Sequence, residues 1–554
     1  MKDWHKSVVY QIYPKSFNSY YNTETGDIKG VTEKLDYLQK LGVDYIWLTP
    51  IYRSPQNDNG YDVSDYYSID PSYGTMEEFE ELLAEAKKRE IDIMLDIVVN
   101  HSSTEHKWFQ EARHDKNSPY RDFYIWRDEK NNWQSKFGGS AWEYDEKTKQ
   151  YYLHLFDKTQ ADLNWENEKL REEVYEMMRF WLEKGVTGFR LDVINLISKE
   201  QHFLDDEGTL ATSDGRKYYT DGPRVHEYLQ EMNQEVFAGK DVITVGEMSS
   251  TTIDNCIKYS NPERKELSMT FSFHHLKVDY PNGDKWTKSD FDFTQLKEIM
   301  SKWQIEMQEG GGWNALFWCN HDQPRIVSRF GDDKRYRNES AKMLATAMHM
   351  LQGTPYIYQG EEIGMTNPGF DNIDLYRDVE SLNIYKMKQE EGMSNEEIIE
   401  ILQQKSRDNS RTPMQWNVEE NAGFTTNTPW ISVAENYKEI NVEKAIEDKH
   451  SIFYYYKKLI GLRKKYDVIT DGKYEIVDMK NPYIWIYTRK LEDEVLLVVN
   501  NFYEETIMYS VPEEGVTDNE MKQEILISNY EDSGEDIRNL VLRPYESIVY
   551  RLTK

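Results

Sequence analysis

The chain has 554 residues, with 67 basic against 99 acidic side chains and a formal net charge of −32. This length exceeds the roughly 250–300 residues that one hydrophobic core supports, so we expect one large domain with one or two smaller ones. The acidic balance argues against nucleic acid and against an anionic membrane as partners, because both are bound by basic surfaces.

The N-terminus carries no pattern that predicts export. The chain passes from Met-Lys-Asp-Trp-His-Lys directly into a strand pattern, without an apolar signal segment. No stretch approaches the roughly 18 apolar residues that a membrane-spanning helix needs. Cys256 and Cys319 lie far apart and outside any CxxC pattern, which predicts neither a disulfide framework nor a zinc site. We expect a cytoplasmic monomer.

Strand and helix patterns alternate over the first hundred residues. Apolar runs predict strands at 8–13, 43–49 and 93–99. Leucines at three-residue spacing predict a helix over 32–41, and a capping box at 75–78 begins a second helix. This alternation is typical of a parallel sheet.

The alternation breaks after Asn100 and His101. No pattern of helix length appears between 101 and 171, and a structureless loop of that length is rare inside a compact domain. We therefore predict a small inserted domain over 101–171. The alternation resumes with a helix over 172–183 and a strand over 186–192.

Four further strands bring the predicted count to eight. Eight strands with intervening helices are what a closed (β/α)8 barrel, an α/β fold, requires. A doubly wound open sheet is the alternative, but no glycine-rich phosphate turn follows the first strand. The four strands are expected at 242–245, 267–273, 315–319 and 355–358.

The remaining chain predicts further helices and then a second sheet. A charged helix is expected near 394–404, and a final helix over 451–466 completes the barrel. From 472 onward apolar residues alternate with period two, which is typical of an antiparallel β-domain. The predicted division is a barrel of 1–100 and 172–471, an inserted domain of 101–171 and a C-terminal β-domain of 472–554.

Three acidic residues stand at the ends of predicted strands. Asp192, Glu247 and Asp322 each close or follow an apolar run. If those strands are parallel neighbours, the carboxylates meet at the face of the barrel where such enzymes carry their catalytic residues. Like charges a few ångströms apart raise one another's pKa values, and acid–base chemistry uses that difference.

Five segments lie at or near predicted strand ends. They are Asp96-Ile-Val-Val-Asn-His101, Gln160-Ala-Asp-Leu-Asn164, Gly188-Phe-Arg-Leu-Asp192, Val245-Gly-Glu247 and Asn320-His-Asp322. In this order they resemble the segments of glycoside hydrolase family 13, the α-amylase superfamily. The resemblance spans essentially the whole chain, and residues 160–164 with 407–416 are similar to the oligo-1,6-glucosidase subgroup.

This resemblance implies a glycosidase that retains the anomeric configuration. It implies Asp192 as the nucleophile, Glu247 as the general acid/base, and Asp322 as the carboxylate that stabilises the distorted sugar. Such a double displacement needs two carboxyl groups about 5–5.5 Å apart, one ionised and one protonated. Arg190 is expected to keep Asp192 ionised, because a nearby positive charge lowers a carboxyl pKa.

The same resemblance implies a closed pocket for a terminal glucose. The residues implied are His101 and His321 for the sugar hydroxyls, Tyr61 under the ring, and Asp62 with Arg411 at the closed end. Arg407, slightly earlier in the chain, is the alternative to Arg411.

One segment departs from the family pattern. Relatives often carry an acid-rich calcium loop after the first strand, whereas residues 19–27 offer only Asp27 at an acidic position of that loop. Because Ca²⁺ takes about 6–8 oxygen ligands, we expect no metal there, and we expect no cofactor.

A basic stretch distinguishes this chain within the subgroup. His274, His275, Lys277 and Lys285 stand where ordinary oligoglucosidases tend to place acidic residues. This stretch resembles that of trehalose-6-phosphate hydrolases, which implies a sugar phosphate as substrate and hydrolysis of its α,α-1,1 bond. A sugar phosphate carries about −1.5 to −2 charges, so an acidic protein binds it only where a local cationic patch reverses the field.

Other interpretations of the same scaffold stay open. Lys277 and Lys285 are alternatively solvated surface lysines, in an oligo-1,6-glucosidase or dextran glucosidase that acts on unphosphorylated isomalto-oligosaccharides. A sucrose isomerase, which transfers glucose to a sugar, shares the scaffold too. Inactive members that serve as partner subunits of membrane transporters lack the carboxylates that this chain retains.

Overall fold

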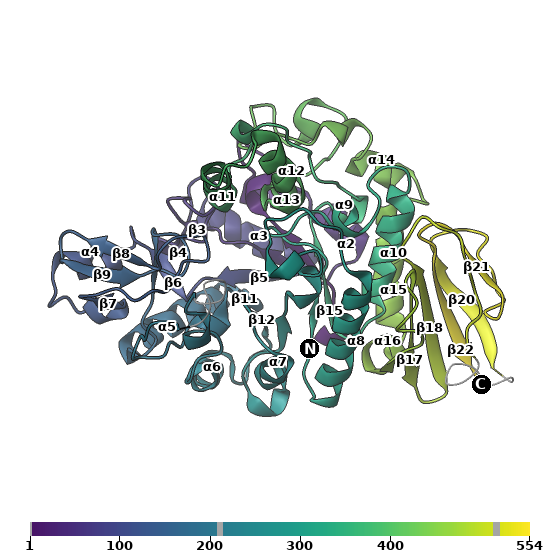
Figure 1. Cartoon of the computed structure of the whole chain (residues 1–554), viewed down its shortest axis with the longest axis horizontal. Helices are drawn as coiled ribbons and strands as arrows, with labels where there is room; N and C mark the ends of the chain where they lie inside the picture. The colour runs from purple at the N-terminus through teal and green to yellow at the C-terminus, as the bar shows by residue number, and fades with distance from the viewer. Residues whose placement is uncertain (1–2, 208–213, 513–520) are drawn as a thin grey trace.

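Eight parallel strands form a closed barrel at the centre of the computed structural model, which describes residues 3–207, 214–512 and 521–554 (Figure 1). The hydrogen-bonded order is β13-β12-β11-β5-β2-β1-β15-β14, and a parallel bridge between Thr270 and Asn314 joins the two ends of this order. The predicted (β/α)8 barrel is confirmed. Its strands are β1 (Val9–Ile12), β2 (Tyr45–Leu48), β5 (Asp92–Ile97), β11 (Gly188–Leu191), β12 (Ile243–Glu247), β13 (Met269–Phe271), β14 (Ala315–Leu316) and β15 (Thr354–Tyr358).

The barrel strands are buried along their length, as is usual for strands that helices cover on the outside. Neighbouring strands are in register, with Gly188 opposite both Met94 and Ile243. A Cβ atom at Gly188 would lie 3.2 Å from Met94 Cβ, so the glycine lets β11 pack closely there. Asp96 and Arg190 are charged residues on these buried strands, and both belong to the site described below.

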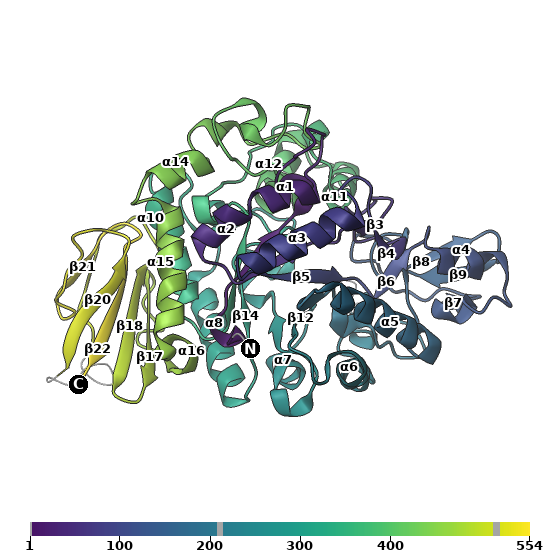
Figure 2. The same cartoon turned by 180° about the vertical axis from the view of Figure 1, so that it is seen from behind.

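Helices alternate with the strands and surround the barrel (Figure 2). The helix predicted over 32–41 is in fact two, because Lys34 leaves the helical conformation between them. The helix predicted over 172–183 begins earlier because Asn167 caps it, accepting a hydrogen bond from the N–H of Lys169. The barrel helices are α1 (Ile28–Glu33), α2 (Leu35–Leu41), α3 (Met76–Lys88), α5 (Glu168–Lys184), α6 (Val225–Met232), α7 (Ile253–Ser260), α8 (Phe293–Glu309), α10 (Arg337–His349) and α15 (Ile452–Lys465).

The segment between β5 and α5 projects from one side of the barrel (Figures 1 and 2). It holds a three-stranded antiparallel sheet in the order β7-β9-β8 and an antiparallel pair of β6 with β10. The boundary predicted at 171 falls inside α5, and the division into domains stays a prediction. The elements are β6 (His101–Ser103), α4 (Lys107–His114), β7 (Trp126–Arg127), β8 (Trp142–Asp145), β9 (Gln150–Leu153) and β10 (Gln160–Asp162).

The predicted C-terminal antiparallel sheet lies on the opposite side of the barrel from this segment, against α8 and α10 (Figure 1). Alternate residues of its strands, such as Trp485 and Tyr487, join the core of the barrel. The Tyr487 hydroxyl donates a hydrogen bond to the Ala347 carbonyl of α10 at 2.8 Å. The sheet order is β16 (Lys473–Ile476), β17 (Ile484–Leu491), β18 (Glu494–Asn501), β22 (Ser547–Thr553) and β20 (Lys522–Ser528), with a separate pair of β19 (Ile507–Tyr509) and β21 (Leu540–Leu542).

Shorter elements lie on the loops between the barrel strands and helices. The helix predicted near 394–404 is α12, which begins after the capping box of Ser394 and Glu397. Among the helices that the structure describes, none combines the length and apolar character needed to cross a membrane. The remaining elements are β3 (Tyr52–Arg53), β4 (Asp65–Ile69), α9 (Ile326–Phe330), α11 (Val379–Glu390), α12 (Asn395–Lys405), α13 (Asp408–Arg411), α14 (Val442–Glu447) and α16 (Asp467–Asp471).

Candidate active site

The three predicted acids lie on the carboxyl-terminal side of barrel strands. Asp192 directly follows β11, Glu247 is the last residue of β12, and Asp322 lies on the loop after β14. Since β11 and β12 are hydrogen-bonded neighbours, the first two carboxylates emerge side by side. This is the face at which (β/α)8 enzymes carry their active sites.

Arg190 forms ion pairs with three carboxylates. Its Nη1 atom lies 2.6 Å from Asp192 Oδ1 and 2.9 Å from Asp96 Oδ1, and its Nη2 atom lies 2.7 Å from Glu247 Oε2. Asp96 is in turn held by the Tyr61 hydroxyl and the Trp47 indole N–H, at 2.9 and 3.1 Å. One guanidinium therefore orients the predicted nucleophile and the predicted acid/base together.

The environment gives the carboxyl groups of Glu247 and Asp192 different pKa values. Burial raises the pKa of Glu247 to about 8 against the opposing effect of Arg190, and the charge of Asp192 adds to the rise. Burial also raises the pKa of Asp192 to about 6, although Arg190 opposes it. Burial outweighs Arg190, yet with a pKa of about 6 Asp192 is ionised near neutral pH, as expected for the nucleophile. Near neutral pH the pair holds one proton, and Glu247 carries it.

Asp322 lies in a cluster of basic residues. Arg411 Nη2 lies 2.7 Å and Arg407 Nη1 3.4 Å from Asp322 Oδ1, and His321 Nε2 lies 3.3 Å from its Oδ2. Burial raises the pKa of Asp322, but His321, Arg407 and Arg411 together hold it well below its usual range. Asp322 is therefore ionised throughout the range in which Glu247 and Asp192 titrate.

The two predicted sugar-binding histidines are buried and neutral. Burial lowers the pKa of His101 to about 4 and that of His321 to about 3. His101 Nε2 donates to the Tyr61 carbonyl at 3.2 Å, whereas His321 Nε2 completes no hydrogen bond among the described residues. The Tyr61 ring is parallel to that of His321, with the ring centres 5.2 Å apart. These three side chains form one wall beside the carboxylates.

The glucose contacts implied for Asp62 and Arg411 stay predictions. The Asp62 carboxylate accepts hydrogen bonds from the N–H groups of Asn57 and Asp58 and from the Ser54 hydroxyl, which closes a tight loop. That loop presents Asp58 to Arg407, whose Nη2 atom lies 3.2 Å from Asp58 Oδ1. Sequence reasoning missed Asp58, whereas both candidate arginines, Arg407 and Arg411, lie beside Asp322.

Two further residues belong to the site, and only the first carried a signal in the sequence. Asp96 is a charged residue inside an otherwise apolar run, which marks a buried charge that needs a partner. Asp378 begins α11 as its N-cap, and its Oδ1 atom also lies 2.6 Å from Arg407. No local pattern distinguishes Asp378 from an ordinary helix cap, since its contact to Arg407 spans distant parts of the chain.

The four basic residues of the stretch after β13 have different surroundings. His275 is buried and bonds through Nε2 to the Phe317 carbonyl, and His274 packs on Trp303 of α8. Lys285 lies 2.7 Å from Glu380. Lys277 is exposed and has no ion pair with a carboxylate of the described residues.

The loop that lacks calcium ligands is folded around a helix cap. Asp27 accepts hydrogen bonds from the N–H groups of Gly30 and Tyr21, so its carboxylate starts α1. Among the residues that the structure describes, no cluster of three or more His, Cys, Asp or Glu is arranged to hold a metal ion. The absence of a metal stays a prediction.

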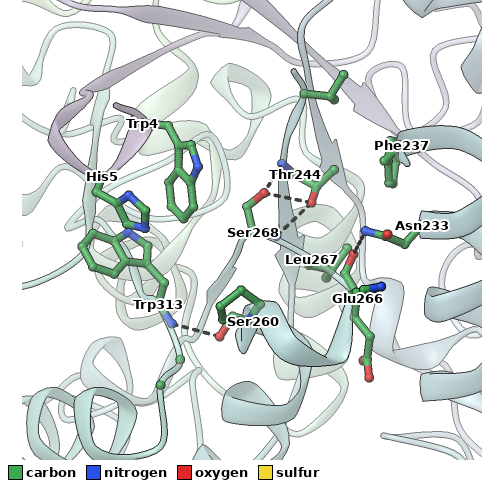
Figure 3. A pocket seen from close by; sticks show the side chains of 15 residues that line it. Trp4, His5, Asn233, Phe237, Thr244, Ser260, Glu266, Leu267, Ser268 and Trp313 are labelled. Carbon is green, nitrogen blue, oxygen red and sulfur yellow. Dashed lines mark hydrogen bonds between the residues drawn. The ribbon is translucent and has the colours of Figure 1, made fainter. Parts of the chain in front are cut away.

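A cavity of about 480 Å³ opens at the opposite end of the barrel (Figure 3). It is lined by Trp4, His5 and Trp313, which precede β1 and β14, and by Thr244 and Ser268 at the beginnings of β12 and β13. Because it lies at the amino-terminal ends of the strands, it is remote from the carboxylates.

Two family descriptions match the chain. Residues 11–472 match the family described as alpha amylase, catalytic domain. Residues 484–549 match the family described as the C-terminal domain of alpha-amylase SusG.

Individual proteins match over the full length. The chain is 63% identical to the trehalose-6-phosphate hydrolase of Bacillus subtilis (strain 168), over 100% of this chain and 98% of that protein. It is 54% identical to the oligo-1,6-glucosidase of Parageobacillus thermoglucosidasius, over 99% of each. The crystal structure of Bacillus licheniformis trehalose-6-phosphate hydrolase superposes with a TM-score of 0.95 at 63% identity, over 100% of both chains.

Proposed function

The chain belongs to the α-amylase family, glycoside hydrolase family 13, and from this premise we propose that it hydrolyses the α,α-1,1 bond of trehalose 6-phosphate. The products are glucose and glucose 6-phosphate. The reaction retains the anomeric configuration, so the glucose is released as its α-anomer.

Two carboxyl groups perform the bond exchange. Asp192 attacks the anomeric carbon while Glu247 donates its proton to the glycosidic oxygen, and glucose 6-phosphate leaves. Glu247 then takes a proton from water, and the resulting attack releases glucose from Asp192. The pKa values of about 6 and 8 support these roles, because they leave Asp192 ionised and Glu247 protonated near neutral pH.

The remaining residues of the site bind the glucose that becomes linked to Asp192. Asp322 stabilises the positive charge that develops on the sugar ring, and His101, His321 and Tyr61 surround that ring. We assign the closed end of the pocket to Asp58 with Arg407, because their ion pair lies beside Asp322. Asp62 supports the pocket by ordering the loop that carries Asp58.

The main observation in favour of a phosphorylated substrate is that Lys277 has no carboxylate partner in the part of the chain that the structure describes, although the protein as a whole is acidic. Lys277 stands exposed after β13, on the same face as Glu247, without an ion pair to a described carboxylate. A phosphate dianion on the leaving sugar would supply that partner. The full-length similarity to a trehalose-6-phosphate hydrolase supports the same choice.

The second candidate is an oligo-1,6-glucosidase, favoured by the 54% identity to a protein of that name. It uses the same carboxylates, so only the leaving-group side separates the two. Lys285 paired with Glu380 is compatible with either substrate.

The test is product analysis with trehalose 6-phosphate and isomaltose in parallel. Proton NMR of the fresh reaction is expected to show α-glucose first, with glucose 6-phosphate in equal amount. Release of β-glucose would overturn the assignment of retention. Cleavage of isomaltose without cleavage of trehalose 6-phosphate would overturn the substrate and favour the second candidate.

We also place the reaction in the cytoplasm, carried out by a monomer. A sugar phosphate is charged and does not diffuse across a lipid bilayer, so enzyme and substrate must share a compartment. Cell fractionation with an activity assay, and the mass of the purified protein in solution, test these two expectations.

A further inference from the structure

We propose that Lys136, on the segment inserted after β5, is a specificity-determining residue that binds the substrate phosphate together with Lys277. This inference rests on the proposed function and deepens it, because it brings a second cation to the leaving-group side from a different part of the fold.

The backbone around Lys136 is held firmly between β7 and β8. The Lys136 N–H donates to the Leu155 carbonyl at 2.8 Å, and the Ser135 hydroxyl donates to the Phe156 carbonyl at 2.6 Å. The next residue, Phe137, lies against the guanidinium of Arg407 at 4.8 Å from the ring centre. Lys136 therefore stands at the rim of the site on an ordered backbone.

The side chain of Lys136 reaches across to the barrel. Its Nζ atom lies 3.3 Å from the Ser249 hydroxyl, two residues beyond Glu247 at the end of β12. This places the ammonium group on the side of Glu247, the proton donor to the leaving sugar. The positive charge of Lys136 would therefore attract a phosphate group on that sugar.

Lys277 approaches the same place from the other side. It ends the 3₁₀ turn His274–Leu276, and the His274 imidazole of that turn contacts the backbone of Thr251, in the loop after β12. Lys136 and Lys277 thus flank one loop, which begins at the acid/base residue. Burial lowers the pKa of Lys136 to about 8, and the nearby positive charges of Arg216 and Lys277 lower it further.

The charges of this patch are not balanced by the protein. Arg216 also faces it but is paired with Asp214, at 2.6 Å. Lys136 and Lys277 have no ion pair with a carboxylate in the described ranges 3–207, 214–512 and 521–554. Two free cations match the roughly −1.5 to −2 charges of a phosphate monoester.

A structural role for Lys136 is the alternative. In that case its contact with Ser249 merely fastens the inserted segment to the barrel. The two roles differ in what removal of the ammonium group does, because a fastening residue affects glucose and glucose 6-phosphate alike, whereas a phosphate ligand affects only the phosphorylated sugar.

The experiment measures inhibition of p-nitrophenyl α-glucoside hydrolysis by glucose 6-phosphate and by glucose. We expect Lys136→Ala to raise the inhibition constant of glucose 6-phosphate by about 10- to 100-fold relative to that of glucose, as for loss of a charge-assisted hydrogen bond. Lys136→Arg, which keeps the charge, should restore most of this preference. Lys147→Ala, an exposed lysine of the same inserted segment, is the matched control and should change neither constant.

Three outcomes overturn the role of Lys136. They are a wild-type enzyme that binds glucose 6-phosphate no better than glucose, a Lys136→Ala variant with an unchanged ratio, and equal weakening of both sugars. The proposed reaction fails separately. Suppose that wild type prefers glucose 6-phosphate and that Lys136→Ala removes this preference, but that wild type does not cleave trehalose 6-phosphate. The phosphate site would then be supported and the proposed reaction would be refuted.

Discussion

Single residues decide the protonation states in this site, and Arg190 is central to them. It touches Asp192, Asp96 and Glu247, yet burial still raises the pKa of Glu247 to about 8 and that of Asp192 to about 6. Activity needs Asp192 ionised, which is lost as the pH falls below about 6. It also needs Glu247 protonated, which is lost as the pH rises above about 8.

We therefore expect a bell-shaped dependence of kcat/KM on pH for p-nitrophenyl α-glucoside, with limbs near those two values. The limbs report the coupled pair rather than either residue alone. A profile that stays flat from pH 5 to pH 9 would contradict the assigned protonation states.

Replacing the acid/base tests its role directly. Glu247→Gln keeps the shape of the side chain but cannot exchange a proton, so kcat on trehalose 6-phosphate should fall by about 10²–10⁴-fold. The alkaline limb should disappear from the residual activity. Activity close to that of wild type, in a variant with an unchanged unfolding midpoint, would remove Glu247 from the mechanism.

The aspartates of the pocket loop provide a second test at this scale. Asp58→Asn should lower kcat/KM by a similar factor on trehalose 6-phosphate and on p-nitrophenyl α-glucoside, since both present the same glucose to Arg407. Asp62→Asn should instead lower the unfolding midpoint, because one acceptor for the loop N–H groups is lost. Asp62→Asn with full stability and a selective loss of glucose binding would instead support the direct glucose contact first predicted for Asp62.

The residues of the pocket also show which parts of the site the sequence could not predict. Asp192, Glu247 and Asp322 were found because strand ends in a barrel converge, which is a property of the fold. The contact between Asp58 and Arg407 spans two distant loops, and neither loop carries a periodic pattern that predicts it. The proposed assignment of Asp58 and Arg407 to the closed end of the pocket therefore needed the loop geometry.

At the scale of elements, close packing near α1 controls what the sequence tolerates. Gly30 lies inside α1, where a Cβ atom would come within 2.0 Å of the Asn18 carbonyl oxygen. Gly461 lies inside α15, where a Cβ atom meets nothing within 4 Å. The same substitution should therefore have opposite effects.

Gly461→Ala should stabilise the protein by about 0.5–1 kcal/mol, because alanine favours a helix more than glycine does. Gly30→Ala should destabilise it by about 1–3 kcal/mol, because the backbone carbonyl of Asn18 cannot move aside cheaply. Unfolding midpoints at one scan rate compare the two with wild type. Stabilisation by both substitutions would mean that α1 does not approach Asn18 as described.

The barrel elements were predictable because apolar runs and capping boxes are local signals. The predicted capping box at Thr75 begins α3, and α12 begins after Ser394, close to the start of the helix expected near 394–404. The break at Lys34 and the early start of α5 at Asn167 were missed. The leucine spacing of 32–41 continues through the break at Lys34, and the helix expected over 172–183 begins after the true boundary, so the apolar pattern alone misplaced both.

For the whole molecule, the C-terminal sheet is part of the core that supports the barrel. Trp485, Tyr487 and Leu496 belong to the same buried cluster as the barrel residues. Lys297 of α8 is buried and donates a hydrogen bond to the Ile484 carbonyl of the sheet. The sheet therefore covers apolar surface of α8 and α10 that water would otherwise reach.

We expect a chain that ends at Gly472 to be insoluble or to expose this surface. Binding of a hydrophobic dye and loss of the near-ultraviolet dichroism would register the change. A truncated chain that stays soluble and retains wild-type kcat on p-nitrophenyl α-glucoside would show that the barrel is stable without the sheet.

The central claim concerns the phosphate, and kcat/KM on trehalose 6-phosphate relative to trehalose measures it most directly, because the two substrates differ only in that group. Charge-assisted hydrogen bonds to phosphate contribute on the order of 1.5–3 kcal/mol each, so wild type should prefer trehalose 6-phosphate by about 10²-fold or more. Lys277→Ala should lower this ratio by roughly 10- to 100-fold. A wild-type ratio near one, or a ratio that Lys277→Ala leaves unchanged, would contradict the account.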